Sequence, residues 1–169
     1  MTSHFPTIHH RAYLSLGSNL GEKAENLRLA RKELTRRGLY IQKASSLYKT
    51  EPVDYLAQDW FLNQGLQAGT NFAPDQLLDC CLQVETHLGR ERRVVKGPRL
   101  IDIDILLYDE TIIKSARLEI PHPRMHLRRF VLEPLAAIAP SAFHPLLKKT
   151  VSALLRDCQD SSVVLKLAD

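Results

Sequence analysis

Residues 96–108 read KGPRLIDIDILLY, and the rest of the chain can be arranged around this stretch. From residue 101 onward, every second residue is Ile or Leu, namely Ile101, Ile103, Ile105 and Leu107. The positions between and after them are Asp102, Asp104, Leu106 and Tyr108. Alternation with a period of two is typical of a β-strand, on which successive side chains point to opposite faces. The sequence therefore predicts a strand with Asp102 and Asp104 on one face, beside Leu106 and Tyr108. The opposite face would carry Ile101, Ile103, Ile105 and Leu107.

The two aspartates have a spacing that suits a shared cation. Positions two apart on a strand are roughly 6.6 Å apart at Cα, so the carboxylates can lean together. Such carboxylates repel each other unless a cation lies between them, and Mg²⁺ binds through one or two carboxylates plus substrate phosphates. The alternative is the wet face of an amphipathic strand behind a solvated basic loop. Possible phosphate donors precede the pair at Arg90, Arg92, Arg93, Lys96 and Arg99.

The composition fits one domain that binds anionic partners. The chain has 169 residues, of which 44% are hydrophobic, enough for a single domain with a buried core. The formal net charge of +4 favours nucleotides, phosphorylated metabolites or nucleic acid. A signal sequence and a long apolar span are both missing from the sequence, so we expect a soluble, non-secreted protein. We expect residues 1–10 to be a disordered leader and residues 11–169 a single catalytic domain.

The cysteines favour a reducing compartment. Cys80 and Cys81 are adjacent within a helical pattern, and Cys158 is remote from both. This arrangement fits neither a disulfide framework nor the spacing of a metal site. We therefore predict a cytoplasmic protein.

The remaining patterns alternate strands with helices. Besides 101–108, strands are predicted at 11–16, 39–48, 66–70, 111–114 and 162–167, with a hairpin turn at 109–110. Helices are predicted from residue 22 to a stop at Gly38, from residue 74 to a stop at Gly89, and over 151–155 with Thr150 as cap. Residues 131–138 should return to the core. Residues 50–60 have no period and predict a loop, which we interpret as a flap.

The turn after the first strand, residues 17–21, reads GSNLG but does not match a phosphate-binding loop. Three residues separate its glycines, whereas the Walker pattern has four residues before Gly-Lys-Ser/Thr. Turn chemistry is one interpretation of this segment. A contribution to a pocket is the other.

Two further features leave alternatives open. Phe61 and Asn63 could grip a flat heterocycle by stacking and by hydrogen bonds at its edge; alternatively, Trp60 and Phe61 belong to the core and Asn63 caps a turn. Glu85 lies about one turn before the end of its helix. It would either orient an arginine or face water.

Several motifs taken together resemble one family. They are GSN at 17–19, YKT at 48–50, FLN at 61–63, GRxR at 89–92, GPRxxDxD at 97–104 and PHPRM at 121–125, with Arg128 and Phe130. In this order they resemble the 6-hydroxymethyl-7,8-dihydropterin pyrophosphokinases of folate biosynthesis, over residues 12–140. The resemblance implies an α+β fold, a ferredoxin-like sandwich with a mostly antiparallel sheet and helices packed on it. It also implies transfer of the terminal diphosphate of ATP to the pterin hydroxymethyl group, with release of AMP.

The resemblance also implies roles for individual residues. Asp102 and Asp104 would hold two Mg²⁺ ions and, with Arg90 and Arg99, form the catalytic set. ATP would be bound by Glu85, Arg90, Arg92, Arg99, Ile105, Arg117, His122 and Arg128. The pterin would be bound by Thr50, Pro52, Val53, Phe61, Asn63, Lys96 and Phe130. The loops at 50–60 and 90–98 would close over a monomeric enzyme whose partners are these two small molecules, with no nucleic acid and no membrane.

One departure from the family pattern keeps other functions open. Many relatives carry Arg-Trp before Gly-Pro-Arg, where this chain has Val95-Lys96. The tryptophan that stacks on the pterin is thereby lost, although Lys96 could supply charge to the phosphates. A regulatory nucleotide binder without chemistry is one alternative. An RNA-binding module of the same architecture is another, but its Lys/Arg-Gly-Phe motif does not occur in the sequence.

Overall fold

The computed structural model describes residues 7–89 and 100–169. The large sheet contains β1 (His10–Ser18), β2 (Tyr40–Ala44), β3 (Tyr48–Thr50), β4 (Phe61–Thr70), β5 (Asp102–Tyr108) and β10 (Val164–Lys166). Two small sheets pair β6 (Ile113–Lys114) with β7 (Glu119–Ile120) and β8 (Phe143–His144) with β9 (Lys149–Thr150). The helices are α1 (Lys23–Arg36), α2 (Pro74–His87), α3 (Arg129–Ile138) and α4 (Val151–Asp157), with a 3₁₀ turn η1 at Met125–Leu127.

The large sheet is antiparallel and has the strand order β10-β3-β4-β1-β5, with β2 also paired to β4. Along the chain, β1 and α1 are followed by β2, β3 and β4, and then by α2 and β5. This is the ferredoxin-like arrangement, in which each helix connects strands that are not neighbours in the sheet. The predicted α+β fold class is confirmed.

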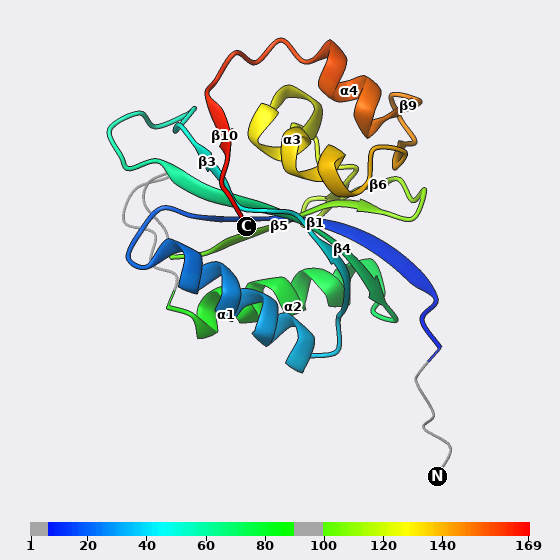
Figure 1. Ribbon diagram of the computed structural model, residues 1–169. Coiled ribbons are helices and arrows are strands. Elements are labelled where there is room, and N and C mark those ends of the chain that lie inside the picture. Colours follow the sequence, from blue (N-terminus) through cyan, green and yellow to red (C-terminus); the bar gives the residue numbers. More distant parts are fainter. Residues whose placement is uncertain (1–6, 90–99) are drawn as a thin grey trace.

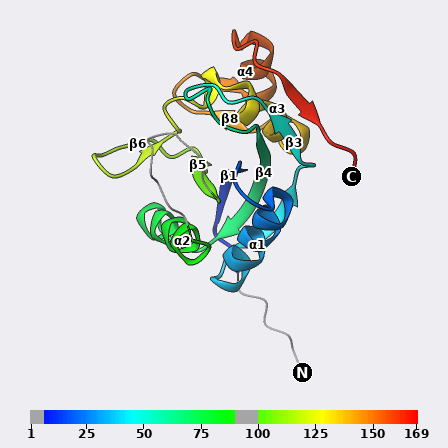
Figure 2. The ribbon, with the colours of Figure 1, turned by 90° about the vertical axis from the view of Figure 1, so that its left-hand side faces the viewer.

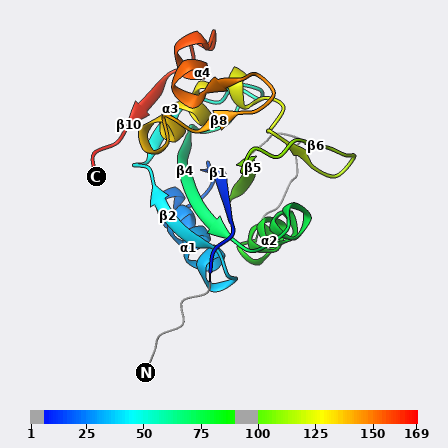
Figure 3. The ribbon, with the colours of Figure 1, turned by 90° about the vertical axis from the view of Figure 1, so that its right-hand side faces the viewer.

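Helices cover both faces of this sheet. Figure 1 shows α1 and α2 on one face and α3 and α4 on the other, and the side views in Figures 2 and 3 show the same layers. Leu27, Ala30 and Leu34 recur at helical spacing on α1 and are fully buried against the sheet. Gly38 and Gly89 follow α1 and α2 with positive φ angles of 112° and 82°, so both predicted stops are confirmed.

A β-bulge changes the faces of β5. Tyr13 pairs with Leu107 while Leu14 pairs with Ile105, so Leu106 is an extra residue on β5. As a result, Tyr108 joins the cluster under α1 and α2, and Leu107 packs toward α3 and α4. The predicted alternation therefore holds as far as Leu106 and is wrong for Leu107 and Tyr108. It holds for the two aspartates, which precede the bulge.

The predicted strand at 39–48 is two strands. It breaks at Ser45, whose Oγ accepts a hydrogen bond from Gly65 N at 2.9 Å while its N–H donates to Gly65 O at 2.9 Å. Their shared partner β4 begins at Phe61, five residues before the predicted strand at 66–70. Gly65 also admits α3, because a Cβ there would lie 3.2 Å from Leu135 N and from the carbonyl carbon of Pro134.

Two other boundaries differ from expectation. Thr111 N donates to Tyr108 O at 3.0 Å, which closes a turn, but the chain then leaves the sheet and β6 pairs with β7 instead of β5. Thr7 and His9 lie within the expected leader 1–10, and both are bonded to Asn71, which donates to Thr7 O at 2.8 Å and accepts from His9 N at 2.9 Å.

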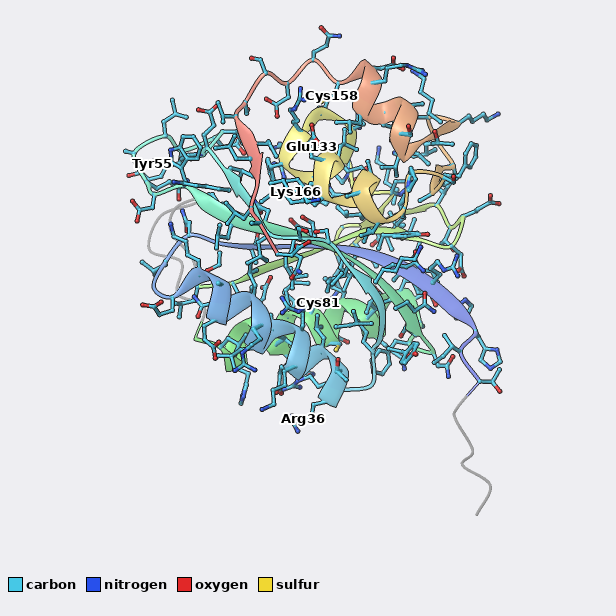
Figure 4. The ribbon with its side chains drawn as sticks, in the orientation of Figure 1. Arg36, Tyr55, Cys81, Glu133, Cys158 and Lys166 are labelled. Carbon is cyan, nitrogen blue, oxygen red and sulfur yellow. The ribbon has the colours of Figure 1, made fainter. Side chains whose placement is uncertain are left out.

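The C-terminal part matches the predictions closely. Thr150 Oγ1 accepts a hydrogen bond from Ala153 N at 3.2 Å and caps α4. β10 is an edge strand on β3, where Val164 pairs with Thr50. The cysteines are free, and Figure 4 shows Cys81 beneath the sheet and Cys158 beyond α3. Over the described ranges, the helices are too short or too polar to cross a membrane.

Candidate functional site

A cavity of about 380 Å³ lies over one end of the large sheet, where β1 ends and β4 and β5 begin. Strands supply its floor, and the loop after β3 and the segment after β7 supply its walls. Its lining consists of Ser15, Gly17, Thr50, Glu51, Pro52, Val53, Asp54, Gln58, Phe61, Asn63, Asp102, Asp104, His122, Pro123, Arg124, Arg128 and Phe130.

The strand register brings the floor residues together. Asp102 pairs with Gly17, and Gly17 pairs with Asn63 on the other side. Asp104 pairs with Ser15. Residues directly opposite each other on antiparallel strands project to the same face, and this face is covered farther along by α3. Gly17, Asn63, Asp102 and Asp104 all line the cavity.

The carboxylates form the acidic part of the cavity. Asp102 and Asp104 are partly buried, whereas Ile103 between them is in the core, so the predicted common face is confirmed. Over residues 7–89 and 100–169, His, Cys, Asp and Glu form no metal-binding group of three or more. Two oxygen donors that open into a cavity fit Mg²⁺, which completes its coordination with phosphate and water.

The amide and aromatic residues line the neighbouring part of the cavity. Asn63 is 3% exposed, and its Nδ2 donates to Thr50 Oγ1 at 2.5 Å. Phe61 and Phe130 line the same cavity, so Phe61 is not a core residue and Asn63 is not a turn cap. Trp60 lies outside the lining, with Lys49 Nζ 5.4 Å from its ring centroid.

The turn after β1 anchors the loop that forms one wall. Asn19 is 2% exposed, and its Nδ2 donates to Gln58 Oε1 at 2.7 Å. Lys23 Nζ donates to Trp60 O at 2.7 Å. Gly17 itself lines the cavity, where a Cβ would lie only 2.7 Å from Asn63 Oδ1. Gly17 and Ser18 are the last residues of β1, so the turn interpretation is wrong for these two, and the pocket interpretation holds for Gly17.

Basic side chains gather on the opposite wall. Arg128 lies 3.5 Å from Asp54 across the cavity, and its Cζ is 5.7 Å from the Phe130 ring centroid. Burial, together with the nearby positive charges of Arg128 and Arg124, lowers the pKa of His122 to about 4 against the opposing effect of Asp102. The His122 imidazole is therefore neutral at pH 7. Its Nδ1 accepts a hydrogen bond from Arg124 N at 3.1 Å.

Three residues expected to bind ATP lie away from this cavity. Ile105 is 5% exposed within the core, and Arg117 forms ion pairs with Asp79 and Asp75 on α2. Glu85 is 3% exposed, and its Oε1 accepts a hydrogen bond from Ile103 N at 2.8 Å. The expectation that Glu85 faces water is wrong. Arg90, Arg92, Lys96 and Arg99 fall outside the described residues.

Sequence reasoning did not single out several lining residues. Ser15 could have been found, since it lies two positions before Gly17 on one strand. Arg124 lies inside a motif that was recognised, but no role was expected for it. Glu51, Asp54 and Gln58 belong to a loop without a period, so the sequence gives no signal for them.

Residues 13–140 match the family model described as 7,8-dihydro-6-hydroxymethylpterin-pyrophosphokinase. The chain is 44% identical over 128 residues to the 2-amino-4-hydroxy-6-hydroxymethyldihydropteridine pyrophosphokinase of Bacillus subtilis, covering 75% of this chain and 77% of that protein. The enzyme of the same name from Methylorubrum extorquens is 45% identical over 131 residues, covering 77% and 83%. The folic acid synthesis protein fol1 of Schizosaccharomyces pombe is 42% identical over 135 residues, which are 79% of this chain and 18% of that protein.

The chain thus spans only about a fifth of such larger relatives, 18% of the Schizosaccharomyces pombe protein and 22% of the Dictyostelium discoideum FOL1. Among solved structures, it is similar to an HPPK-DHPS of Plasmodium falciparum with a TM-score of 0.71 and 17% identity, covering 91% of this chain and 46% of that one. An HPPK-DHPS in complex with substrates gives a TM-score of 0.68 at 14% identity, with 87% and 43% covered. At these identities the structures support the fold alone.

Proposed function

This chain belongs to the 7,8-dihydro-6-hydroxymethylpterin pyrophosphokinase family, and from that premise we propose that it transfers diphosphate from ATP to 6-hydroxymethyl-7,8-dihydropterin. The hydroxymethyl oxygen would attack the β-phosphorus of ATP and lose its proton. The new O–P bond would form as the bond between the α,β-bridging oxygen and the β-phosphorus breaks. AMP would leave with the bridging oxygen.

One observation carries this proposal: a single cavity joins a carboxylate pair, arginines and an aromatic slot with an amide. Its volume of about 380 Å³ lies within the range of small-molecule sites. Reaction between two substrates requires that both be held together in the correct orientation. Phosphate-binding groups and a slot for a flat ring in the same cavity meet that requirement.

Asp102 and Asp104 would hold Mg²⁺ at the floor of the cavity, and we propose two ions. Bound Mg²⁺ neutralises the charge on phosphate oxygens and polarises the attacked phosphorus. Arg128 would contact the phosphates from the opposite wall. Neutral His122 can donate one hydrogen bond from Nε2 without adding charge. Arg90, Arg92, Arg99 and Lys96 remain predictions for the same phosphates.

The pterin would occupy the slot beside these groups. Phe61 and Phe130 offer aromatic faces, and Asn63 offers an amide to the ring edge. The hydrogen bond from Asn63 Nδ2 to Thr50 Oγ1 limits rotation of that amide, so the edge contact is set before binding. Pro52 and Val53 belong to the anchored loop and would exclude water from the reaction.

The wider setting of the enzyme also remains a proposal. We propose that residues 11–169 act as one catalytic domain and as a monomer, on small molecules alone. A cytoplasmic location is supported by the free cysteines.

The test is incubation of the protein with ATP, Mg²⁺ and 6-hydroxymethyl-7,8-dihydropterin, with AMP and the pterin diphosphate measured by chromatography. Both products should appear in equal amounts, and AMP should not form without the pterin. Absence of AMP from folded protein would defeat the proposal. Asp102→Asn and Asp104→Asn keep the side-chain size but remove the charge, and each should lower turnover by about 100-fold or more. Near-normal turnover in both would exclude the metal role.

A further inference from the structure

The edge of β5 is closed by contacts from outside the sheet. Within the described ranges, β5 is an edge strand of the large sheet, and its one strand partner there is β1. Exposed edges leave backbone groups without a strand partner. Here Ile103 N donates to Glu85 Oε1 at 2.8 Å, and Leu106 O accepts from His122 N at 2.9 Å.

The contact at Ile103 lies between the two residues proposed to hold Mg²⁺. Asp102 and Asp104 flank Ile103, whose own side chain is 5% exposed in the core. The backbone of the carboxylate pair is therefore held from three directions. β1 pairs with it on one edge, the Ile103 side chain anchors it below, and Glu85 binds the other edge.

Glu85 is placed for this contact by α2. The helix buries Cys81 and Val84 under the sheet, and Glu85 follows in its last turn with 3% of its surface exposed. A buried carboxylate is costly unless hydrogen bonds satisfy it.

We propose that Glu85 is a positioning residue, which holds the β5 backbone at Ile103 so that Asp102 and Asp104 keep the separation needed for their cations. The inference rests on the metal role in the proposed function. Mg²⁺ demands near-ideal octahedral geometry, so a small displacement of either carboxylate should weaken binding. Glu85 acts here through the Ile103 amide and without contact to the cation.

Matched substitutions separate this role from charge and from packing. Glu85→Gln keeps an acceptor oxygen at the same place and removes the charge. Glu85→Met keeps the length and removes the acceptor. Leu77→Ala, at the other end of α2, loses buried volume without touching the Ile103 amide. If Glu85→Met does not fold, Glu85→Asp is used in place of Glu85→Met, because its side chain is shorter by one methylene and moves the acceptor away from the Ile103 amide.

The first measurement is hydrogen exchange of the Ile103 amide in protein without metal or nucleotide. The second is Mn²⁺ binding in the presence of a non-hydrolysable ATP analogue, followed by electron paramagnetic resonance. The third is the Mg²⁺ concentration for half-maximal rate. Neither of the first two needs a working enzyme, so failure of the proposed activity stays distinguishable from failure of this inference.

Glu85→Met should speed exchange at Ile103 by about tenfold or more, the loss expected for one hydrogen bond. It should weaken Mn²⁺ binding and raise the Mg²⁺ requirement by at least about fivefold, with the KM for pterin within about twofold. Glu85→Gln should resemble the parent protein in all three, and Leu77→Ala should lower only the Tm. Equal losses in Glu85→Gln and Glu85→Met would overturn the inference in favour of a role for charge. Unchanged cation binding in Glu85→Met would overturn it outright.

Discussion

A methyl group added at Gly17 should damage the pterin slot selectively. The Cβ of Gly17→Ala would lie 2.7 Å from Asn63 Oδ1 and 3.6 Å from Phe61 Cδ1. Relief to an ordinary contact of 3.4 Å requires the Asn63 amide to move by about 0.7 Å. That amide is 3% exposed and bonded to Thr50, so it cannot retreat without losing the bond.

The displacement sets the expected size of the effect. A misplacement near 1 Å in a positioned group can cost about 100-fold in rate, so we expect kcat/KM for the pterin to fall by about 10- to 100-fold. The KM for ATP should stay within about twofold, because the change is on the amide side of the cavity. Overpacking should lower the free energy of unfolding by about 1 to 3 kcal/mol.

Steady-state kinetics with each substrate varied in turn would measure the effect. Gly69→Ala is the matched control. Gly69 lies on β4 but does not line the cavity, and its Cβ would lie 2.6 Å from Ile8 Cγ2. It should destabilise the protein and leave both KM values unchanged. In an Asn63→Ala background, Gly17→Ala should cost little more. A pterin kcat/KM within twofold of the parent, in folded Gly17→Ala, would refute the reasoning.

Two further predictions concern stability. Because the pKa of His122 is about 4 in the fold and near 6.5 when unfolded, the unfolded chain takes up the proton first on acidification. Lowering the pH from 7 to 5 should therefore reduce the free energy of unfolding of the parent protein by about 2 kcal/mol. His122→Gln lacks the titrating imidazole and should not show this part of the loss. Urea unfolding at both pH values measures this, and equal losses in the two proteins would contradict it. Gly65→Ala should lower the free energy of unfolding by about 1 to 3 kcal/mol, because its Cβ would lie 3.2 Å from the backbone of α3. An unchanged Tm would show that α3 moves away from β4 at no cost.

The parts of the fold set by local chemistry were predictable. The alternation at residues 101–105 placed both aspartates on one face, and Gly38 and Gly89 marked the helix ends. The motifs around Phe61, Asn63, His122 and Arg128 named side chains that line one cavity. Each of these signals lies within a few neighbouring residues.

The parts set by partners remote in the sequence were not predictable. The bulge at Leu106 depends on how Tyr13 and Leu14 pair with β5, and the break at Ser45 depends on its bonds to Gly65. Likewise, the sequence did not reveal that Glu85 is buried against the Ile103 amide, because that partner lies 18 residues away. Patterns within a short window carry no information about such contacts.

The strand β10 extends the support of the cavity beyond the segment that defines the family. The family match stops at residue 140, yet Val164 pairs with Thr50, and Val163 exchanges hydrogen bonds with Glu51. Thr50 and Glu51 line the cavity, although no lining residue lies beyond Phe130 in the described chain. A protein shortened to the matched segment would keep every lining side chain of the cavity. It would lose β10, whose pairing with β3 supports the wall at Thr50 and Glu51.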